Sequence, residues 1–176
     1  MNQSVYINIA KKSDAQAIVN YYQKLSVDSK NKFAPHPFEI EYLSNHIFEN
    51  ENYITILAQD KKTNEVIGYA VTQLWIFDYD IERWTKYDQV INNDDKEFAC
   101  FAPSVADEYH HAGIGSALLN FTTALLNERY IKHVLLWGGV KCTNIPAVKF
   151  YLKNGFKLMG HFDYEGGNYD MLLTID

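Results

Sequence analysis

Cysteine, basic charge and long apolar runs are scarce in this sequence, and each scarcity excludes a class of protein. Two cysteines in 176 residues are too few for a disulfide framework, and the spacing of Cys100 and Cys142 is no zinc signature. No run approaches the roughly 20 apolar residues of a membrane span, and the first residues contain no apolar core of signal-peptide length. The 16 basic residues are outnumbered by 22 acidic ones, which argues against binding nucleic acid by phosphate neutralisation. We therefore expect a reduced, cytoplasmic protein with no nucleic-acid or membrane partner.

The composition is that of a globular protein. Apolar residues make up 47% of the chain and charged residues 22%, and the length is near that of one domain. The 13 tyrosines and 10 phenylalanines are many for this length; most are expected in the core, although aromatic side chains also line pockets. The formal net charge of -6 is compatible with a cationic substrate such as an amine.

The order of apolar patterns predicts one mixed α/β domain across residues 1–176. Strands are expected at 5–9, 53–58, 66–72, 98–105, 133–137, 156–160 and 169–175, and helices after Ser13, at 38–48, after Gly113 and at 146–153. A capping box of Ser13 and Gln16 is expected to start the first helix. Residues 28–32 are predicted to be a loop, and 74–96 a long loop or an extended hairpin arm.

The junction between the fourth expected strand and the next helix is the most informative part of the sequence. It contains the run His110-His111-Ala112-Gly113-Ile114-Gly115. Glycines let the backbone turn sharply and approach a ligand, while the first turn of a helix has unpaired amides and the positive end of the helix dipole. These features favour a phosphate or pyrophosphate site, although a glycine pair at a helix start also occurs in a tight turn packed on a sheet.

This run resembles the phosphate loop of the GNAT acetyltransferases, whose pattern is Gln/Arg-x-x-Gly-x-Gly/Ala. Gly113 and Gly115 match, and His110 stands where the family has Gln or Arg. Further along, the chain is similar to the second signature of the family, Asn-x-x-Ala-x-x-φ-Tyr-x-x-x-Gly-Phe, where φ is apolar. The residues in register are Asn144, Ala147, Phe150, Tyr151, Gly155 and Phe156. Two motifs in the right order are more specific than either one.

The resemblance implies a fold and a cofactor. The fold is a central, mostly antiparallel sheet that is splayed between strands four and five and flanked by about four helices. The co-substrate is acetyl-CoA, and no metal is expected, because adjacent His110 and His111 chelate poorly without a third ligand. The residues implied in cofactor binding are Ser104, Val105, His110, His111, Ala112, Gly113, Ile114, Gly115, Ser116, Asn144, Ala147, Phe150 and Tyr151.

Attack of an amine on a thioester requires a proton acceptor, stabilisation of the carbonyl oxygen and a proton for the departing thiolate. The resemblance places Tyr151 near the sulfur, where its protonated phenol is the candidate acid; the alternative is a structural tyrosine of the core. Backbone N–H groups around Val105 would polarise the carbonyl. Glu97 is the candidate base, although a water chain could replace it.

Several other groups remain open from the sequence. Asp78 and Asp80 could bind a cationic substrate or be solvated surface acids. Cys142 has no partner at a recognisable spacing, so direct transfer is expected rather than a covalent route. The remaining candidate bases are His36, His46 and His161.

The sequence thus predicts an acetyl-CoA-dependent N-acyltransferase that moves an acetyl group directly to a primary amine of a small molecule or peptide. The first helix pair and residues 74–96 would line the acceptor site. The alternatives are a non-catalytic acyl-CoA-binding or sensor module and an interaction domain that uses the aromatic segment. A homodimer through that segment or through the C-terminal strands would not exclude catalysis.

Overall fold

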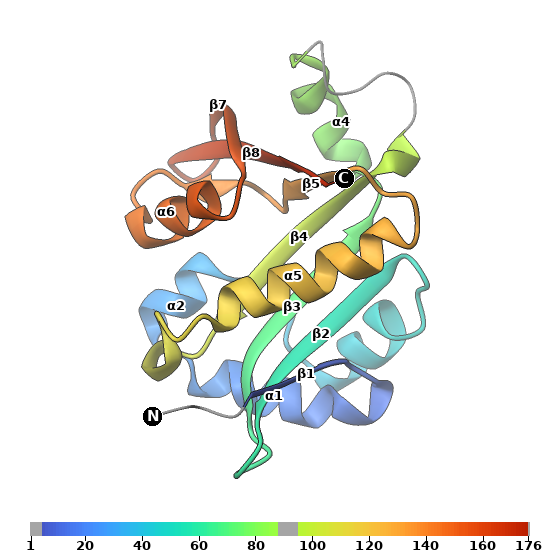
Figure 1. Ribbon diagram of the computed structural model, residues 1–176, viewed down its shortest axis with the longest axis vertical. Helices are drawn as coiled ribbons and strands as arrows, with labels where there is room; N and C mark the ends of the chain where they lie inside the picture. Colours follow the sequence, from blue (N-terminus) through green and yellow to red (C-terminus); the bar gives the residue numbers. More distant parts are fainter. Residues whose placement is uncertain (1–4, 88–94, 176) are drawn as a thin grey trace. The chain divides into compact units, whose positions relative to one another are not determined.

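The structure, a computed structural model, describes residues 5–87 and 95–175. The strands are β1 (Val5–Ile9), β2 (Tyr53–Asp60), β3 (Val66–Leu74), β4 (Phe98–Val105), β5 (His133–Leu136), β6 (Val140–Lys141), β7 (Lys157–Asp163) and β8 (Gly167–Thr174) (Figure 1). The α-helices are α1 (Ala15–Lys24), α2 (Val27–Lys32), α3 (Ile40–Tyr42), α4 (Asp78–Thr85), α5 (Ile114–Asn127) and α6 (Ile145–Lys153). A π-helical stretch, Leu43–Ile47, continues α3.

The strands follow the order β1-β2-β3-β4-β5-β8-β6, and β7 pairs with β8. The β4–β5 pair is parallel, whereas β8 pairs antiparallel with β5, β6 and β7 and β1 pairs antiparallel with β2. The predicted mixed α/β fold with a mostly antiparallel sheet is therefore confirmed. The chain divides into two compact units, residues 1–72 with 102–123 and residues 73–101 with 124–176.

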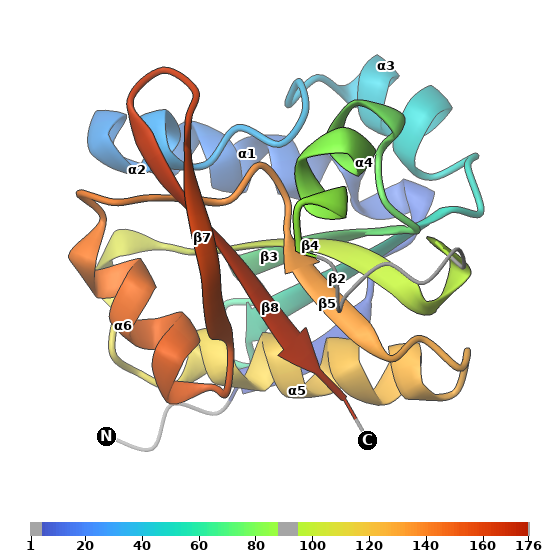
Figure 2. The same cartoon turned by 90° about the horizontal axis from the view of Figure 1, so that it is seen from above.

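In the first unit, helices cover both faces of the strands. Figure 2 shows α1 on one face of β2 and β3 and the beginning of α5 on the other. Gly68 in β3 makes this packing close, because a Cβ there would lie 3.1 Å from Ile114 Cγ2 and 3.2 Å from Leu118 Cδ1. Ile114 and Leu118 are both buried. The first turn of α5, and the segment before it, are therefore held firmly against the strands of this unit.

In the second unit, β8 lies between α4 and the end of α6. Neighbouring residues of a strand point to opposite faces, so successive residues of β8 contact different helices. Leu172 joins a buried cluster with α4. That cluster contains Ile76, Trp84, Phe98, Cys100, Leu135 and Leu172. Leu173 points the other way, and its Cδ1 lies 3.3 Å from where a Cβ of Gly155, just after α6, would be. Consequently, α4 and the end of α6 pack on opposite faces of β8.

Residues 5–87 and 95–175 form six α-helices rather than about four, and the additional ones lie where apolar periodicity is weak. The predicted loop at 28–32 is wrong: α2 covers it, with Ser26 Oγ accepting from Ser29 N (3.1 Å) as an N-cap and an Asp28–Lys32 ion pair (2.6 Å). None of its residues is buried, so no apolar stripe marks it. The segment 74–96 is not a simple loop or hairpin arm, because it contains α4; its residues 88–94 lie outside the described part.

Two smaller predictions also need correction. The expected capping box of Ser13 and Gln16 is absent from the described start of α1, where Lys11 N instead donates to Asp14 Oδ2 (2.8 Å) in a preceding 3₁₀ turn. The short β6 was not predicted, since two residues are too few to show an alternating pattern. It becomes a strand only by pairing Val140 with Tyr169 of β8. Both differences concern local hydrogen bonds and leave the order of the other elements unchanged.

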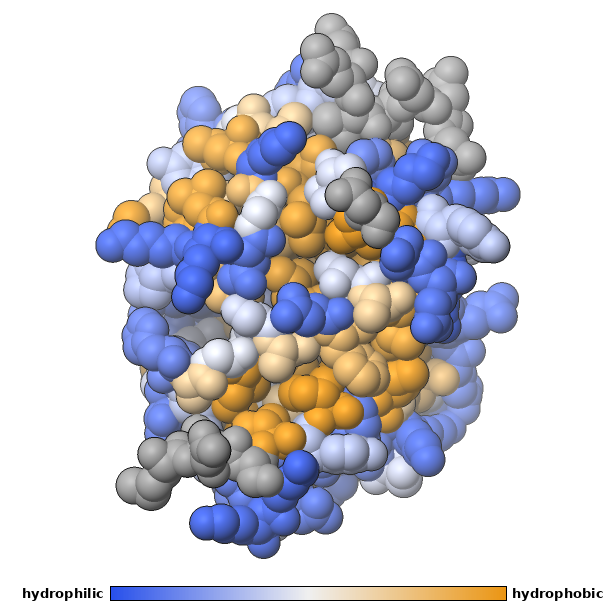
Figure 3. Space-filling model, viewed as in Figure 1, coloured by the Kyte–Doolittle hydropathy of each residue, from blue (hydrophilic) through white to orange (hydrophobic). Residues whose placement is uncertain are grey.

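Some apolar side chains of the outermost strand remain at the surface. Figure 3 shows apolar residues gathered over β1 in the lower half of the view. Tyr6 is 54% exposed and Ile9 46% exposed. Single exposed apolar residues are common on monomers, so these two side chains are no evidence for a dimer. The predicted homodimer therefore stays a prediction.

Candidate functional site

The segment before α5 has the backbone geometry of an anion site. After a 3₁₀ turn at Asp107–Tyr109, φ is positive at His111 (64°) and Gly113 (81°). Ala117 N donates to Gly113 O (3.0 Å), and by helix geometry the amides of the turn before Ala117 have no acceptor inside the helix. Backbone amides at such a turn, with the positive end of the helix dipole behind them, favour a phosphate.

The outer side of this loop is open. A Cβ added at Gly113 would meet no atom of the described residues within 4 Å. His110, His111 and Ala112 are exposed, whereas Ile114 is buried against the strands. The loop is therefore anchored through its helix while its amides remain accessible to a ligand.

Asp107 fastens the start of the loop to α2. Its carboxylate accepts hydrogen bonds from Ser26 N and Ser26 Oγ (3.0 Å each) and from Ser29 Oγ (2.5 Å). The bond from Ser29, followed by that from Ser26 N, lowers the pKa of the Asp107 carboxyl. Asp107 is thus ionised at neutral pH, and we expect α2 and the loop to be positioned together.

The ring of His110 is bonded to the end of β4. His110 Nε2 lies 3.0 Å from Val105 O, and because a carbonyl oxygen only accepts, Nε2 carries the hydrogen. The other nitrogen, Nδ1, carries a proton only when the ring is charged. Toward an anion, His110 is thus a donor only as imidazolium, unlike an arginine, which is always charged.

The backbone of β4 points alternately to its two sides. Just after the strand, Ala106 N donates to Ile67 O (2.9 Å), so even-numbered residues face β3. Within the strand, Phe101 O accepts from Trp137 N (3.0 Å), so odd-numbered residues face away from β3. The parallel register with β5 ends at the pair Phe101–Leu136, where β5 itself ends, while β4 continues to Val105.

Two of the last β4 residues therefore direct their backbone away from β3, Pro103 and Val105. Proline has no N–H, so the donor on this side is Val105 N–H and an acceptor is Pro103 C=O. Ser104, also predicted to pair with the cofactor through its backbone, faces β3 with that backbone. Its hydroxyl accepts a hydrogen bond from Tyr21 Oη (2.9 Å), so its side chain lies toward α1.

In the second unit, the residues of the second signature form the start of α6. Asn144 is the N-cap, and its Oδ1 accepts from Ala147 N (3.4 Å), with Pro146 in the first turn. The oxygen of Asn144 is engaged in this cap, which leaves its NH₂ group for a ligand. Phe150, the other apolar signature residue of the helix, is half-buried.

Tyr151 is buried on α6. The rings of Phe150 and Phe156 lie 5.1 Å from its ring, centroid to centroid. Burial raises the pKa of the Tyr151 phenol far above its usual range, so the group is protonated at neutral pH. It can donate a proton or hydrogen bond and cannot act as a base there, as its predicted role requires.

The predicted acids occupy different environments. Glu97 directly precedes β4, is half-buried and forms an ion pair with Lys132 Nζ. Asp78 is exposed in the first turn of α4. The carboxylate of Glu97 is thus already paired with the ammonium group of Lys132. Its role as the base stays a prediction.

Asp80 belongs to a buried charged cluster that the sequence did not reveal. Arg83 Nη1 pairs with Asp80 Oδ1 (2.9 Å) and Arg83 Nε with Asp170 Oδ1 (3.1 Å), while Tyr87 Oη donates to Asp170 Oδ2 (2.9 Å). The guanidinium also lies over the ring of Phe162 (3.9 Å). Burial raises the pKa of both carboxyls. The charge of Asp80 is therefore used to fasten α4 to β8, rather than left free for a cationic substrate.

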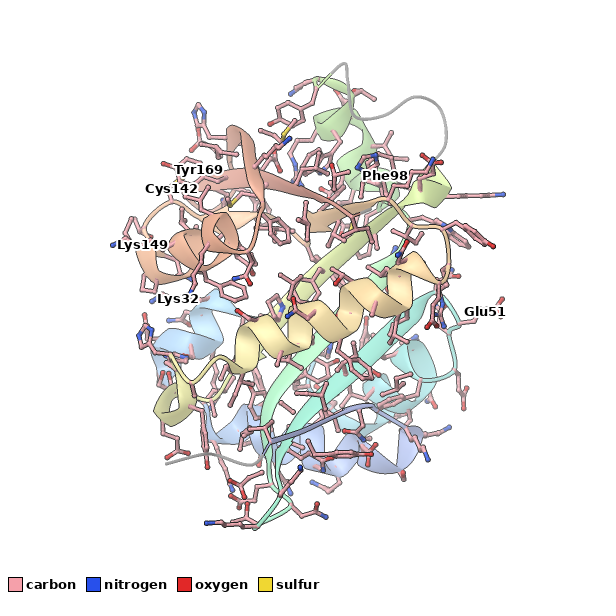
Figure 4. The ribbon with its side chains drawn as sticks, viewed as in Figure 1. Lys32, Glu51, Phe98, Cys142, Lys149 and Tyr169 are labelled. Atoms are coloured by element: carbon pink, nitrogen blue, oxygen red, sulfur yellow. The ribbon has the colours of Figure 1, made fainter. Side chains whose placement is uncertain are left out.

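The remaining candidates are the nucleophile Cys142 and three histidines that could act as bases, and they differ in burial and in hydrogen-bond partners. Cys142 follows β6 and is labelled in Figure 4; its N donates to Gly167 O (2.9 Å), and its Sγ lies 3.4 Å from where a Cβ of Gly167 would be. His46 and His161 are exposed, whereas His36 is buried and bonded to Tyr69. The partners in that last pair are 33 residues apart, so no spacing rule could have singled out His36.

The described residues contain neither a metal-binding cluster nor a membrane-spanning helix. Within 5–87 and 95–175, no group of three His, Cys, Asp or Glu side chains is placed to hold a metal ion. The helices of these ranges are too short or too polar to cross a membrane.

Comparison with known proteins places the chain in a family. The acetyltransferase (GNAT) family matches residues 19–156, while no curated protein sequence matches. Similar folds include the GNAT domain of PAT from S. lividans (18% identity, 97% of this chain and 90% of that chain, TM-score 0.74). A GNAT acetyltransferase from Streptococcus pneumoniae is similar too (19%, 98% and 100%, 0.72), as is the aminoglycoside acetyltransferase AAC(6')-Ib with coenzyme A and kanamycin (17%, 97% and 95%, 0.72). Since the family match covers most of the sequence, the chain belongs to the acetyltransferase (GNAT) family.

Proposed function

We propose that the chain binds acetyl-CoA with the pyrophosphate on the loop 110–115. The observation that carries this proposal is the open, positive-φ loop before α5, in which Gly113 leaves space where any other side chain would stand. Amides rather than cationic side chains are the donors, so the histidine at position 110 fits this role. The amides of His111 and of residues 113–116 would supply these donors, since Ala112 N already donates to Tyr109 O (3.3 Å), and His110 adds a donor when it is protonated.

The acetyl-bearing arm would pair with the end of β4. Val105 N–H and Pro103 C=O point away from β3, because odd-numbered residues of β4 direct their backbone to that side. The Val105 N–H would donate to the acetyl carbonyl oxygen and stabilise the charge that develops on it. Asn144 would use its free NH₂ group toward the same arm, and Ala147 and Phe150 would supply apolar contacts.

The proposed reaction is direct transfer of an acetyl group to a primary amine of a small molecule or peptide. The amine nitrogen forms a bond to the acetyl carbon, the carbon–sulfur bond breaks, the amine loses a proton and the sulfur gains one. Acetyl-CoA, when bound, supplies the activated thioester. Tyr151, whose buried phenol carries its proton at neutral pH, would protonate or hydrogen-bond the leaving sulfur. Glu97 and His36 are the candidates for the proton acceptor.

Release of free thiol with a panel of amines tests this function. The panel should contain polyamines, amino acids, an aminoglycoside and a peptide with a free N-terminus, each with acetyl-CoA and with a longer acyl-CoA. We expect thiol release above the amine-free background with at least one of them. The alternative, a non-catalytic acyl-CoA-binding module, predicts CoA binding by calorimetry with no release for any amine.

A further inference from the structure

His36 has a single tautomer dictated by its partners. Its Nδ1 lies 2.9 Å from Pro37 O and its Nε2 2.8 Å from Tyr69 Oη. Since the carbonyl oxygen can only accept, Nδ1 must carry the hydrogen. In the neutral ring, Nε2 is then an acceptor, and Tyr69 donates its hydroxyl hydrogen to it.

The surroundings keep this ring neutral. Burial lowers the pKa of His36, an effect that the hydrogen bond to Pro37 O partly offsets. Among the described residues, the titratable groups that face the ring are aromatic: Tyr69 from β3 and Tyr42 from α3, with the ring of His46 tilted against that of Tyr42. Phe38 provides a further wall. A neutral imidazole in this setting can accept a proton, and within residues 5–87 and 95–175 no carboxylate contributes to its pKa and so retains that proton.

Tyr69 lies next to the part of β4 where we propose that the thioester binds. Ala106 N donates to Ile67 O, and two residues further along this antiparallel ladder Tyr69 stands opposite Ser104. Residues opposite each other in a ladder project to the same face. The hydroxyl of Ser104 in turn accepts from Tyr21 Oη (2.9 Å), so three hydroxyl-bearing residues and His36 meet on the α1 side of these strands.

We propose that His36, acting through Tyr69, is the proton acceptor for the amine that is acetylated. This inference rests on the proposed function. The ammonium nitrogen of the bound acceptor gives its proton to Tyr69 Oη, while the hydroxyl hydrogen of Tyr69 passes to His36 Nε2; because Tyr69 is fully buried, the acceptor must reach this hydroxyl directly. Tyr69 is neutral before and after, and the charged ring keeps its bond from Nδ1 to Pro37 O until it releases the proton to solvent.

The proposal accounts for two features together. Tyr69 is fully buried, which raises the pKa of its phenol well above the usual value; a group that only relays a proton need not ionise. His36 retains a 7% exposed edge, through which the proton can leave. Neither His46 nor His161, both exposed, has a hydroxyl partner fixed in this way among the described contacts.

Enzyme kinetics with paired variants test the relay. His36→Gln keeps a hydrogen-bond acceptor for Tyr69 but cannot take a proton, and Tyr69→Phe removes the relay hydroxyl. With the best amine of the panel, we expect each to lower kcat near pH ~7 by roughly 10²-fold, with KM for acetyl-CoA unchanged. The loss should shrink toward pH ~10, where an alkyl amine is deprotonated in water. The double variant should be no slower than either single one, and the control variant His161→Gln, at an exposed position outside this cluster, should match the unmodified protein.

A spectroscopic measurement keeps the test independent of turnover. Imidazole nitrogen chemical shifts of the unmodified protein should show hydrogen on Nδ1 and a hydrogen-bonded lone pair on Nε2, and Tyr69→Phe should change only the Nε2 signal. The opposite tautomer contradicts the relay even if a variant fails to fold. So does a folded His36→Gln chain with unmodified kcat at all pH values, or a deficit that does not shrink at high pH. A chain that acetylates no amine instead contradicts the proposed function itself.

Discussion

Replacing Gly113 by alanine separates the ligand-binding role of the loop from its role in the fold. Gly113 has φ of 81°, and a Cβ there would meet no described atom within 4 Å. The substitution therefore causes no clash, and its structural cost is the strain of a left-handed residue, about 1–2 kcal/mol. In a chain of this size each ~1 kcal/mol lowers Tm by roughly 2–4 °C, so the variant should remain folded.

Gly166 provides a matched control. It lies in the turn between β7 and β8 with φ of 100°, and an added Cβ there also meets no described atom within 4 Å. Gly166→Ala should thus lose about the same stability as Gly113→Ala. Only the methyl group at position 113 would occupy the space proposed for the pyrophosphate, so the two variants should differ in ligand binding and agree in Tm.

Calorimetric titration with CoA and thermal melting of both variants provide the comparison. We expect Gly113→Ala to bind CoA at least ~10-fold more weakly than the unmodified chain, a loss of about 1.4 kcal/mol, and Gly166→Ala to bind it normally. Equal CoA affinity in a folded Gly113→Ala chain would remove the loop from the cofactor site. Equal weakening in both variants would mean that strain, rather than the position of the methyl group, governs binding.

Four further substitutions test individual roles. Tyr151→Phe should lower kcat by about 10²–10⁴-fold with little change in CoA affinity; unmodified turnover in a stable variant would make solvent the proton source. His110→Arg should tighten CoA binding, because arginine is permanently charged and forks onto phosphate, and unchanged affinity in calorimetry would exclude a contact between this side chain and the phosphates. Arg83→Met should cost about 3–5 kcal/mol in urea unfolding at pH ~7 by leaving two buried carboxylates unpaired. Because burial raises the pKa of both carboxyls above their unfolded values, that cost should shrink as the pH falls and they take up protons; a pH-independent loss contradicts this. Glu97→Gln should leave kcat within about twofold if His36 is the proton acceptor, and a fall of roughly 10²-fold would assign the base to Glu97.

Elements with a strong local pattern could be predicted from the sequence. The alternation of β1 and the apolar run of β4 placed both strands with their observed bounds, and the glycine at 113 located the start of α5. The cap at Asn144 and the proline after it located α6 in the same way. In each case the determining interactions lie within a few residues of each other, so they leave a trace in the sequence.

Elements that depend on distant partners could not be predicted. The exposed α2 has no apolar face, and the loop is fastened to it by hydrogen bonds between Asp107 and serines about 80 residues earlier. The pair of His36 and Tyr69 and the pair of Arg83 and Asp170 are likewise long-range contacts. The phosphate loop was found because its function requires a local backbone shape, whereas the proton acceptor depends on the packing of side chains from separate elements.

Incubation with acetyl-labelled acetyl-CoA and the amine panel, followed by mass spectrometry of the amines, tests the central claim most directly. The account predicts that the label appears on the nitrogen of at least one primary amine, in amounts equal to the CoA released, and that Tyr151→Phe slows both together. CoA binding with no labelled amine, or CoA release with the label recovered as acetate at the same rate with and without amine, would contradict it.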